Sequence, residues 1–244
     1  MAFTYPQAAL DWMLDGIGSS LLVLADSLAL PRVLARRGCL VVAVHRDWRR
    51  LRTAIGAQGI SLAGARAEAL PFGDCRFDGI LVHQVFADVA PGLALPEFAR
   101  VLRPQGRLMV SQLGRDNSVP WVRRLVQLIH TVDPNAMTAP PAADTLVPVL
   151  QSKYFHGSAR EFRHWEPITR QGMIDMVGAN PAARRLDVGS RRRLLDAVAA
   201  LHSEAAGNNQ LRLPYQLACW RGQVDHDELT RPVHLDESGL IIHV

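Results

Sequence analysis

Short apolar runs alternate with segments of helical character along the first half of this chain. The runs with the length and polar or glycine boundaries of buried strands cover residues 21–25, 40–44, 60–62, 77–82 and 107–112. Pro31 suits the first turn of a helix that ends at Gly38, and residues 95–102 place apolar side chains on one helical face. This alternation predicts a parallel sheet covered by helices on both faces.

The second half of the chain predicts further helices and two more strands. Residues 161–165 and 213–224 have strand character and are predicted to pair antiparallel at one sheet edge. Helices are expected after caps at Asn117-Ser118 and at Ser190, and another is expected to open near Asp47. The proline-containing stretch 133–143 is expected to be a surface loop.

Packing and turn motifs of the first half point to a known family. They are Ala67-Glu68-Ala69-Leu70-Pro71-Phe72, Phe77-Asp78 and Arg100-Val101-Leu102-Arg103-Pro104. With them, residues 15–222 resemble bacterial class I S-adenosylmethionine (SAM)-dependent methyltransferases of the type 11-like group. The resemblance implies an α/β, Rossmann-like three-layer sandwich around a seven-stranded, mostly parallel sheet. Asp78 is implied to be structural.

The same resemblance implies a domain organisation. Residues 1–222 are expected to form one methyltransferase-like domain that starts with an arm at 1–20 and carries a helical and loop segment at 115–180 over the cleft. Residues 223–244 extend past the resemblance. There, two apolar runs flank Asp236-Glu237-Ser238-Gly239, which predicts a hairpin.

The stretch that should hold the cofactor departs from the family pattern. The family ends its first strand with an acidic residue and a glycine loop, because that backbone must adopt positive φ beside the cofactor. Residues 22–31 contain no glycine, Ala25 occupies the acidic position, and the loop that follows, Asp26-Ser27, is shortened. Asp26 is one residue away, which turns its side chain to the other face of the strand.

Two further cofactor contacts are altered in the same predicted pocket. His45 occupies the position at which the family places an acidic residue on the ribose hydroxyls, and a neutral imidazole offers only one acceptor. Arg66, which precedes Ala67 and Glu68, occupies the position of an Asp that binds the adenine amino group. Arginine has no acceptor and would repel the sulfonium of SAM. Together these changes predict that ordinary SAM binding is lost.

His83 is the best candidate for a catalytic or polar role. It closes the fourth strand, and the carboxyl ends of parallel strands face the ligand crevice of a doubly wound sheet. A histidine that caps the strand and bonds to backbone is the alternative reading. The spacings of histidine and cysteine match no metal motif, so no metal is expected.

The charge and the apolar runs of the sequence bear on the expected partners and location. The net charge is +4, and the arginine clusters are separate and interspersed with acidic residues, which does not favour a nucleic-acid site. No apolar run has the length of a membrane span, and no secretory signal is recognised, so a cytoplasmic location is expected. The predicted hairpin is expected either to fold back onto its own domain or to add to a second subunit, which would make a homodimer or a complex with a related methyltransferase.

Two main functional hypotheses remain open. The first is a pseudoenzyme with a methyltransferase fold that needs no cofactor and acts through protein–protein interaction or by binding another small-molecule ligand. The alternative is an active SAM-dependent methyltransferase that acts on a small molecule through a non-standard cofactor site formed around Asp26, His45 and Glu68. SAM is the expected cofactor only under this alternative.

Overall fold

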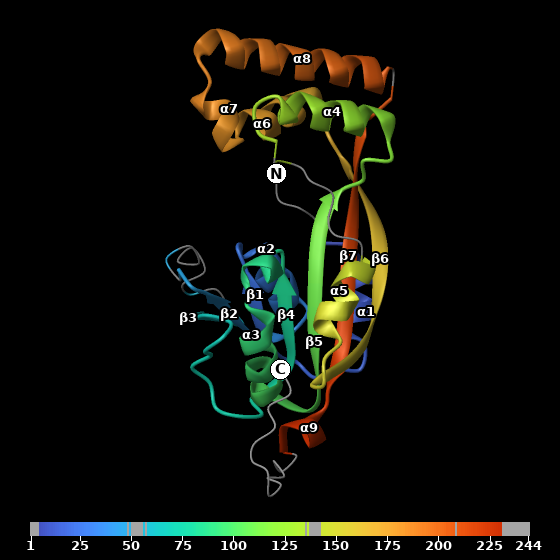
Figure 1. Ribbon diagram of the computed structural model, residues 1–244. Coiled ribbons are helices and arrows are strands. Elements are labelled where there is room, and N and C mark those ends of the chain that lie inside the picture. Colours follow the sequence, from blue (N-terminus) through green and yellow to red (C-terminus); the bar gives the residue numbers. More distant parts are fainter. Residues whose placement is uncertain are drawn as a thin grey trace, which may run out of the picture.

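The computed structural model describes residues 5–47, 49, 56, 58–134, 136, 143–207 and 209–230 (Figure 1). Within these residues, one seven-stranded sheet has the order β3-β2-β1-β4-β5-β7-β6. Its strands are β1 (Ser20–Ala25), β2 (Leu40–His45), β3 (Ile60–Gly64), β4 (Phe77–His83), β5 (Leu102–Arg115), β6 (Phe155–Pro167) and β7 (Arg212–Val224).

The first five strands are parallel and the last two are antiparallel. The strands β1, β2, β3, β4 and β5 pair in parallel, whereas β7 pairs antiparallel with both β5 and β6. This arrangement confirms the predicted fold class and the antiparallel edge. The strands β5 and β6 are longer than predicted at both ends, and their carboxyl ends continue toward a separate group of helices (Figure 1).

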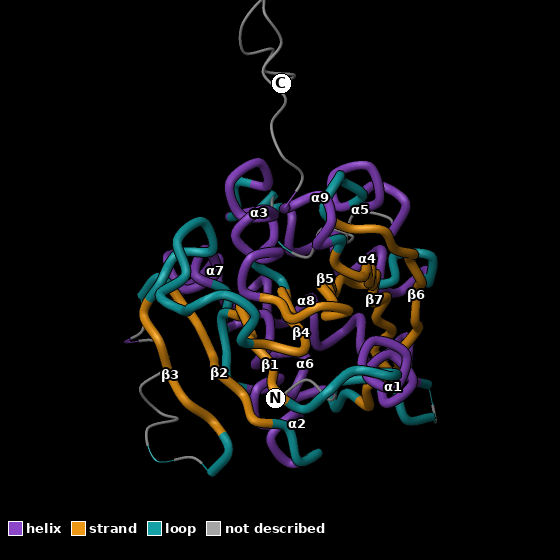
Figure 2. Tube along the Cα trace, turned by 90° about the horizontal axis from the view of Figure 1, so that it is seen from below, coloured by secondary structure: helices purple, strands orange, loops and turns teal. Residues whose placement is uncertain are grey.

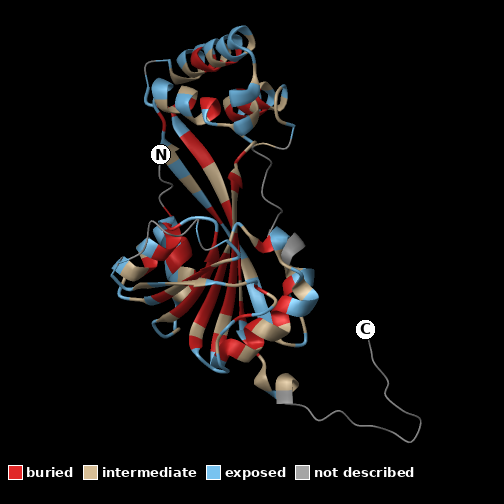
Figure 3. Cartoon of the chain, turned by 90° about the vertical axis from the view of Figure 1, so that its left-hand side faces the viewer, coloured by how far each residue is buried: buried red, intermediate tan, exposed pale blue. Residues whose placement is uncertain are grey.

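Helices cover both faces of the sheet (Figure 2). One face carries α3 (Pro91–Val101), α5 (Ala143–Leu150) and α9 (His226–Thr230), and its core is centred on Phe98, Phe155 and Trp220. The other face carries α1 (Gln7–Leu14) and α2 (Ala29–Arg36), whose Leu10, Met13 and Leu34 are fully buried. The buried strands between these layers are visible in Figure 3.

A helical cap stands at the end of the long strands. It consists of α4 (Pro120–His130), α6 (Arg170–Gly178), α7 (Pro181–Arg185) and α8 (Val188–Ala206) (Figure 1). The cap has its own apolar cluster, which includes Val122, Met173 and Val198 and reaches Leu213 on β7. The cap is therefore packed on the carboxyl end of β5 and the adjoining ends of β6 and β7.

The predicted helix caps are wrong in detail. The helix α4 begins after Val119 with no side-chain cap, and the Ser118 hydroxyl donates instead to the buried Asp116. The helix α8 is capped by Asp187, whose carboxylate accepts from the backbone N–H of Ser190. A carboxylate at this position also interacts favourably with the helix dipole, which explains why it caps the helix in place of the serine.

Three other predicted elements fall largely or wholly in parts of the chain that the structure does not describe. The helix predicted near Asp47 and the loop over 133–143 lie largely outside the described residues, and the hairpin predicted between 232 and 244 lies wholly outside them. The beginning of the C-terminal extension is described. There α9 contacts α3, and His226 Nε2 lies 3.0 Å from the carbonyl oxygen of Leu102.

Candidate functional site

A pocket of about 150 Å³ lies at the carboxyl ends of β1 and β2 and beside the segment that follows β3. The predicted site residues that line it are Ala25, Asp26, His45, Arg66, Ala67 and Glu68. The structure therefore brings together side chains that are up to 43 positions apart in the sequence, from Ala25 to Glu68. Parallel topology is the physical reason, because it places successive strand ends at one edge of the sheet.

Asp26 and His45 contact each other across this pocket. Nδ1 of His45 lies 2.9 Å from both the backbone nitrogen and the carbonyl oxygen of Asp47, and its Nε2 donates to the Asp26 carboxylate, which can only accept. That Nε2 lies 3.0 Å from Oδ1 of Asp26. The His45 side chain is 9% exposed and that of Asp26 is 56% exposed. The imidazole at the end of β2 is thus already engaged on both nitrogens.

Arg66 and Glu68 form the opposite wall of the pocket. The backbone N–H of Ala90 donates to Oε1 of Glu68 at 2.9 Å, and Arg66 Nε lies 3.3 Å from Oε2. The Ala90 bond is the main reason that the pKa of Glu68 is lowered, and Arg66 adds to the effect. The Arg66 side chain is 76% exposed. The wall therefore presents a carboxylate with both oxygens bonded beside a hydrated guanidinium.

A partly buried ion pair supports this wall from behind. Glu97 accepts the backbone N–H of Leu70 at 2.7 Å, and it is held by Arg100 through contacts of 2.7 and 2.8 Å. Arg100 also donates to the carbonyl oxygens of Leu70 and Phe72. The hydrogen bonds from Arg100 are the main cause of the lowered pKa of Glu97. One helix side-chain pair on α3 thus fixes the backbone that continues from Arg66 to Phe72.

Replacing Arg100 by alanine is expected to lower the free energy of unfolding by about 2 to 3 kcal/mol, because it leaves Glu97 partly buried without its cation. Urea unfolding followed by circular dichroism measures this loss. Arg36→Ala, a change of an exposed arginine on α2, is the control and is expected to stay within about 0.5 kcal/mol of the parent protein. Equal losses in the two variants would contradict the assigned role of Arg100.

A second pocket, of about 230 Å³, adjoins the first and shares Asp26 with it. Ser27 and His83, the remaining predicted site residues, line this second pocket. In the sheet, Ala25, His83, Ser111 and Cys219 are successive partners on β1, β4, β5 and β7, so their side chains form a row on one face. His83 therefore projects toward the face covered by α1 and α2.

The His83 imidazole lies in a buried polar cluster. Its Nδ1 is 2.9 Å from Oγ of Ser111, and its ring packs edge-on against Tyr5 with a centroid distance of 5.3 Å. Burial lowers the pKa of His83 to about 4, against opposing contributions from Ser111 and Asp26. Burial also raises the pKa of Tyr5, and a hydrogen bond with Ser111 opposes that rise. His83 is therefore a neutral imidazole at physiological pH.

Tyr5 is a lining residue that sequence reasoning did not find. It comes from the N-terminal arm, and only tertiary packing brings it against the end of β4. The sequence signal available was its place two residues before an amphipathic segment, Gln7–Leu14, which forms α1.

The chain is similar in sequence to known methyltransferases. A family profile described as a methyltransferase domain matches residues 28–110. The uncharacterized methyltransferase Rv3342 of Mycobacterium tuberculosis is 33% identical over 224 residues, which cover 89% of this chain and 88% of that protein. The chain belongs to the class I SAM-dependent methyltransferase family.

Solved structures of other methyltransferase-fold proteins support the fold. A protein of Anaeromyxobacter dehalogenans described as a type II methyltransferase has a TM-score of 0.62 at 18% identity and covers 90% of this chain and 95% of its own. A protein of Anabaena variabilis described as a methyltransferase from an antibiotic biosynthesis pathway has a TM-score of 0.61 at 14% identity and covers 86% and 94%. Such likeness concerns fold, and fold alone does not fix activity.

The residues of this strand-end pocket do not match the polar contacts that the family makes with SAM. Among the described non-glycine residues, positive φ occurs at Cys75, Gln84 and Gln105, so the turn at residues 26–28 lacks the backbone conformation that the glycine loop provides. His45 directs its Nε2 at Asp26 and offers no carboxylate.

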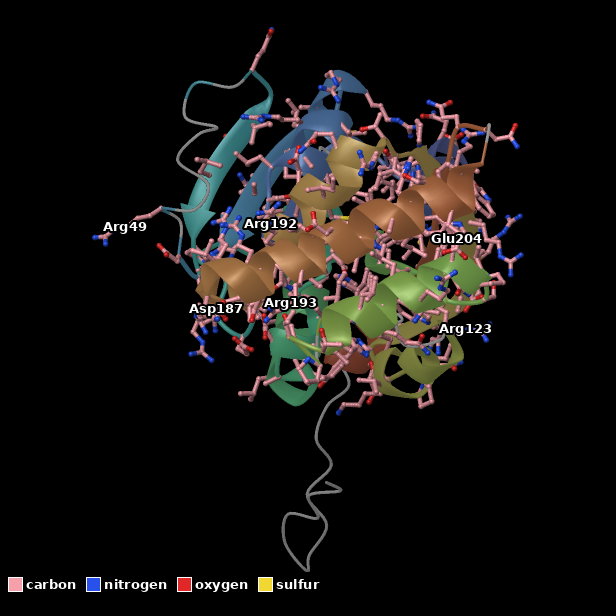
Figure 4. All side chains as sticks on the ribbon, turned by 90° about the horizontal axis from the view of Figure 1, so that it is seen from above. Arg49, Arg123, Asp187, Arg192, Arg193 and Glu204 are labelled. Atoms are coloured by element: carbon pink, nitrogen blue, oxygen red, sulfur yellow. The ribbon has the colours of Figure 1, made fainter. Side chains whose placement is uncertain are left out.

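The outer face of the helical cap carries charges of both signs (Figure 4). Asp187, Arg192 and Arg193 lie toward one end of α8, and Arg123 and Glu204 lie toward the other. Arg124 makes two contacts with Glu204, of 2.6 and 2.9 Å, and Arg192 lies 3.7 Å from Asp196. The basic residues of this face are therefore interspersed with acidic ones.

The described part of the chain offers neither a membrane span nor a metal site. No helix there is both long enough and apolar enough to cross a membrane. In the same residues, no group of at least three His, Cys, Asp or Glu side chains could hold a metal ion.

Proposed function

We propose that this methyltransferase-fold protein does not bind SAM and acts as a binding protein, with the crevice at the carboxyl ends of β1 and β4 holding another small molecule. The observation that carries the proposal is the contact of 3.0 Å between His45 and Asp26. In this contact the polar side chains at the ends of β1 and β2 bond to each other, whereas the family directs the side chains at these strand ends at its cofactor.

The remaining support comes from the same pocket. A ribose would need an acceptor at the end of β2, where His45 has Nδ1 bonded to Asp47 and Nε2 to Asp26. A cationic sulfonium would enter a pocket whose rim carries the exposed guanidinium of Arg66, so the charges would repel. The family match begins at residue 28, directly after the turn that lacks glycine.

Titration calorimetry with SAM and S-adenosylhomocysteine tests the proposal. No binding heat is expected with either ligand at concentrations up to about 1 mM, and thermal unfolding is expected at an unchanged temperature. A dissociation constant of about 1 µM would instead stabilise the protein by about 4 kcal/mol at 1 mM ligand. A binding heat with micromolar affinity would overturn the proposal.

An active methyltransferase with a non-standard cofactor site is the second candidate. Asp26 and Glu68 favour it, because both carboxylates line the pocket at the strand ends where the family binds SAM. Under this alternative, Asp26→Ala weakens SAM binding, whereas the exposed Asp11→Ala on α1 leaves it unchanged. If the parent protein does not bind SAM, this alternative is excluded.

A further inference from the structure

The second pocket has walls suited to an apolar ring. Its apolar lining comes from Tyr5, Ala29, Leu30, Val33 and Leu113. A dry apolar cavity of roughly 150 Å³ is known to hold one benzene molecule. By that scale, the volume of about 230 Å³ suits roughly nine non-hydrogen atoms.

A single ring nitrogen is available to recognise a polar group in this pocket. His83 Nδ1 is bonded to Ser111 at 2.9 Å, and within the described residues Nε2 has no hydrogen-bond partner. The Tyr5 ring packs edge-on against His83, and the Tyr5 residue also interacts with Ser111. When the Ser111 hydroxyl donates to Nδ1, the proton of the neutral imidazole lies on Nε2. That N–H is then a donor within an otherwise apolar lining.

The charges around the pocket select against an anion. Among the described residues, no arginine or lysine lines it, and its one acidic lining residue is Asp26, whose carboxylate lies 3.0 Å from His45 at the rim. The amide of Gln84 is also committed, since its Nε2 donates to the carbonyl oxygen of Leu113 at 3.0 Å. A carboxylate ligand would therefore lose its hydration without gaining a cationic partner.

We propose that this pocket binds a small uncharged cyclic molecule with one carbonyl oxygen, which accepts a hydrogen bond from Nε2 of His83 while its ring contacts Leu30, Val33 and Leu113. The inference rests on the proposed function, because it fills the crevice with a ligand other than SAM. It assigns His83 to binding, and it assigns Ser111 to fixing the tautomer of His83.

Acetophenone, which is uncharged and has a carbonyl oxygen, is the probe, and ligand-observed NMR titration of the full chain is the measurement. Ethylbenzene lacks the oxygen, and benzoate carries a charge at similar size. Acetophenone is expected to bind about fivefold more tightly than ethylbenzene, as one net hydrogen bond implies. Benzoate is expected to bind more weakly than acetophenone. Equal affinity for acetophenone and ethylbenzene, or tighter binding of benzoate, would overturn the proposal.

Two variants separate the hydrogen bond from the pocket itself. His83→Phe is expected to remove the fivefold preference while ethylbenzene still binds, and Val33→Trp is expected to weaken both ligands by filling the space. Circular dichroism and thermal unfolding check that both variants fold. A preference that survives His83→Phe in a folded protein would contradict the role of His83.

Competition with SAM distinguishes this inference from the proposed function. If acetophenone binds as expected and SAM displaces it, the proposed loss of SAM binding is wrong although the pocket assignment stands. If neither acetophenone nor SAM binds, the pocket assignment is wrong and the loss of SAM binding stands.

Discussion

Replacing Gly157 by alanine is expected to destabilise the protein by about 3 kcal/mol, because the added Cβ would press against backbone atoms of β7 that cannot move away. Gly157 on β6 is paired with Gly222 on β7. A Cβ at Gly157 would lie 2.1 Å from the carbonyl oxygen of Arg221 and 2.5 Å from Cα of Gly222. Those atoms belong to β7, which is hydrogen-bonded to β5 on one side and to β6 on the other, so they cannot move independently.

Urea unfolding at neutral pH measures the effect, and Gly73→Ala is the matched control. A Cβ at Gly73 would have no atom within 4 Å, so this variant is expected to remain close to the parent protein. If Gly157→Ala retained the midpoint of the parent protein, the close approach of β6 and β7 at this pair would be contradicted.

Acidification from pH 6.5 to pH 4 is expected to remove up to about 3 kcal/mol of stability through His83 alone. Burial lowers the pKa of this imidazole from 6.5 to about 4 in the folded protein. Between those values the unfolded chain binds a proton that the folded protein does not, so stability falls as the pH falls. Above pH 6.5 the imidazole is neutral in both states and makes no such contribution.

The difference between the parent protein and His83→Phe isolates this effect from other titrating groups. Urea midpoints measured from pH 7.5 to pH 4 are expected to fall less steeply in the variant. His156→Gln is the control, because that side chain is 67% exposed and its hydration changes little on unfolding. Parallel curves for the parent protein and His83→Phe would show that His83 is not held neutral by burial.

The sheet could be predicted from the sequence because its central strands are continuous apolar runs. In β1 every residue from Leu21 to Ala25 is buried, and in β4 every residue from Phe77 to Val82 except Asp78 is buried. The ends of β5 and β6 were missed, since exposed and buried positions alternate irregularly there. Helix α1 was missed because it begins after Pro6 without a side-chain cap.

The candidate site was predictable to the extent that strand topology determines it. His45, Arg66 and Glu68 follow strands that the sequence identifies, and the structure places them around one pocket. The contact between His45 and Asp26 was not predictable, because it depends on the orientation of two side chains from neighbouring strands. Tyr5 reaches the second pocket only through the packing of the N-terminal arm.

The chain connects the sheet to the cap helices through β5, β6 and β7, and these three strands form one continuous ladder of backbone hydrogen bonds. Leu213 on β7 belongs to the apolar cluster of the cap. A transplanted cap from a relative would therefore need to match the strand ends as well as the helices. A shift of one residue would turn every side chain of a strand to the opposite face. Chimeras joined within the short linkers, such as residues 116–119, preserve that register and are the practical route to exchanging this part.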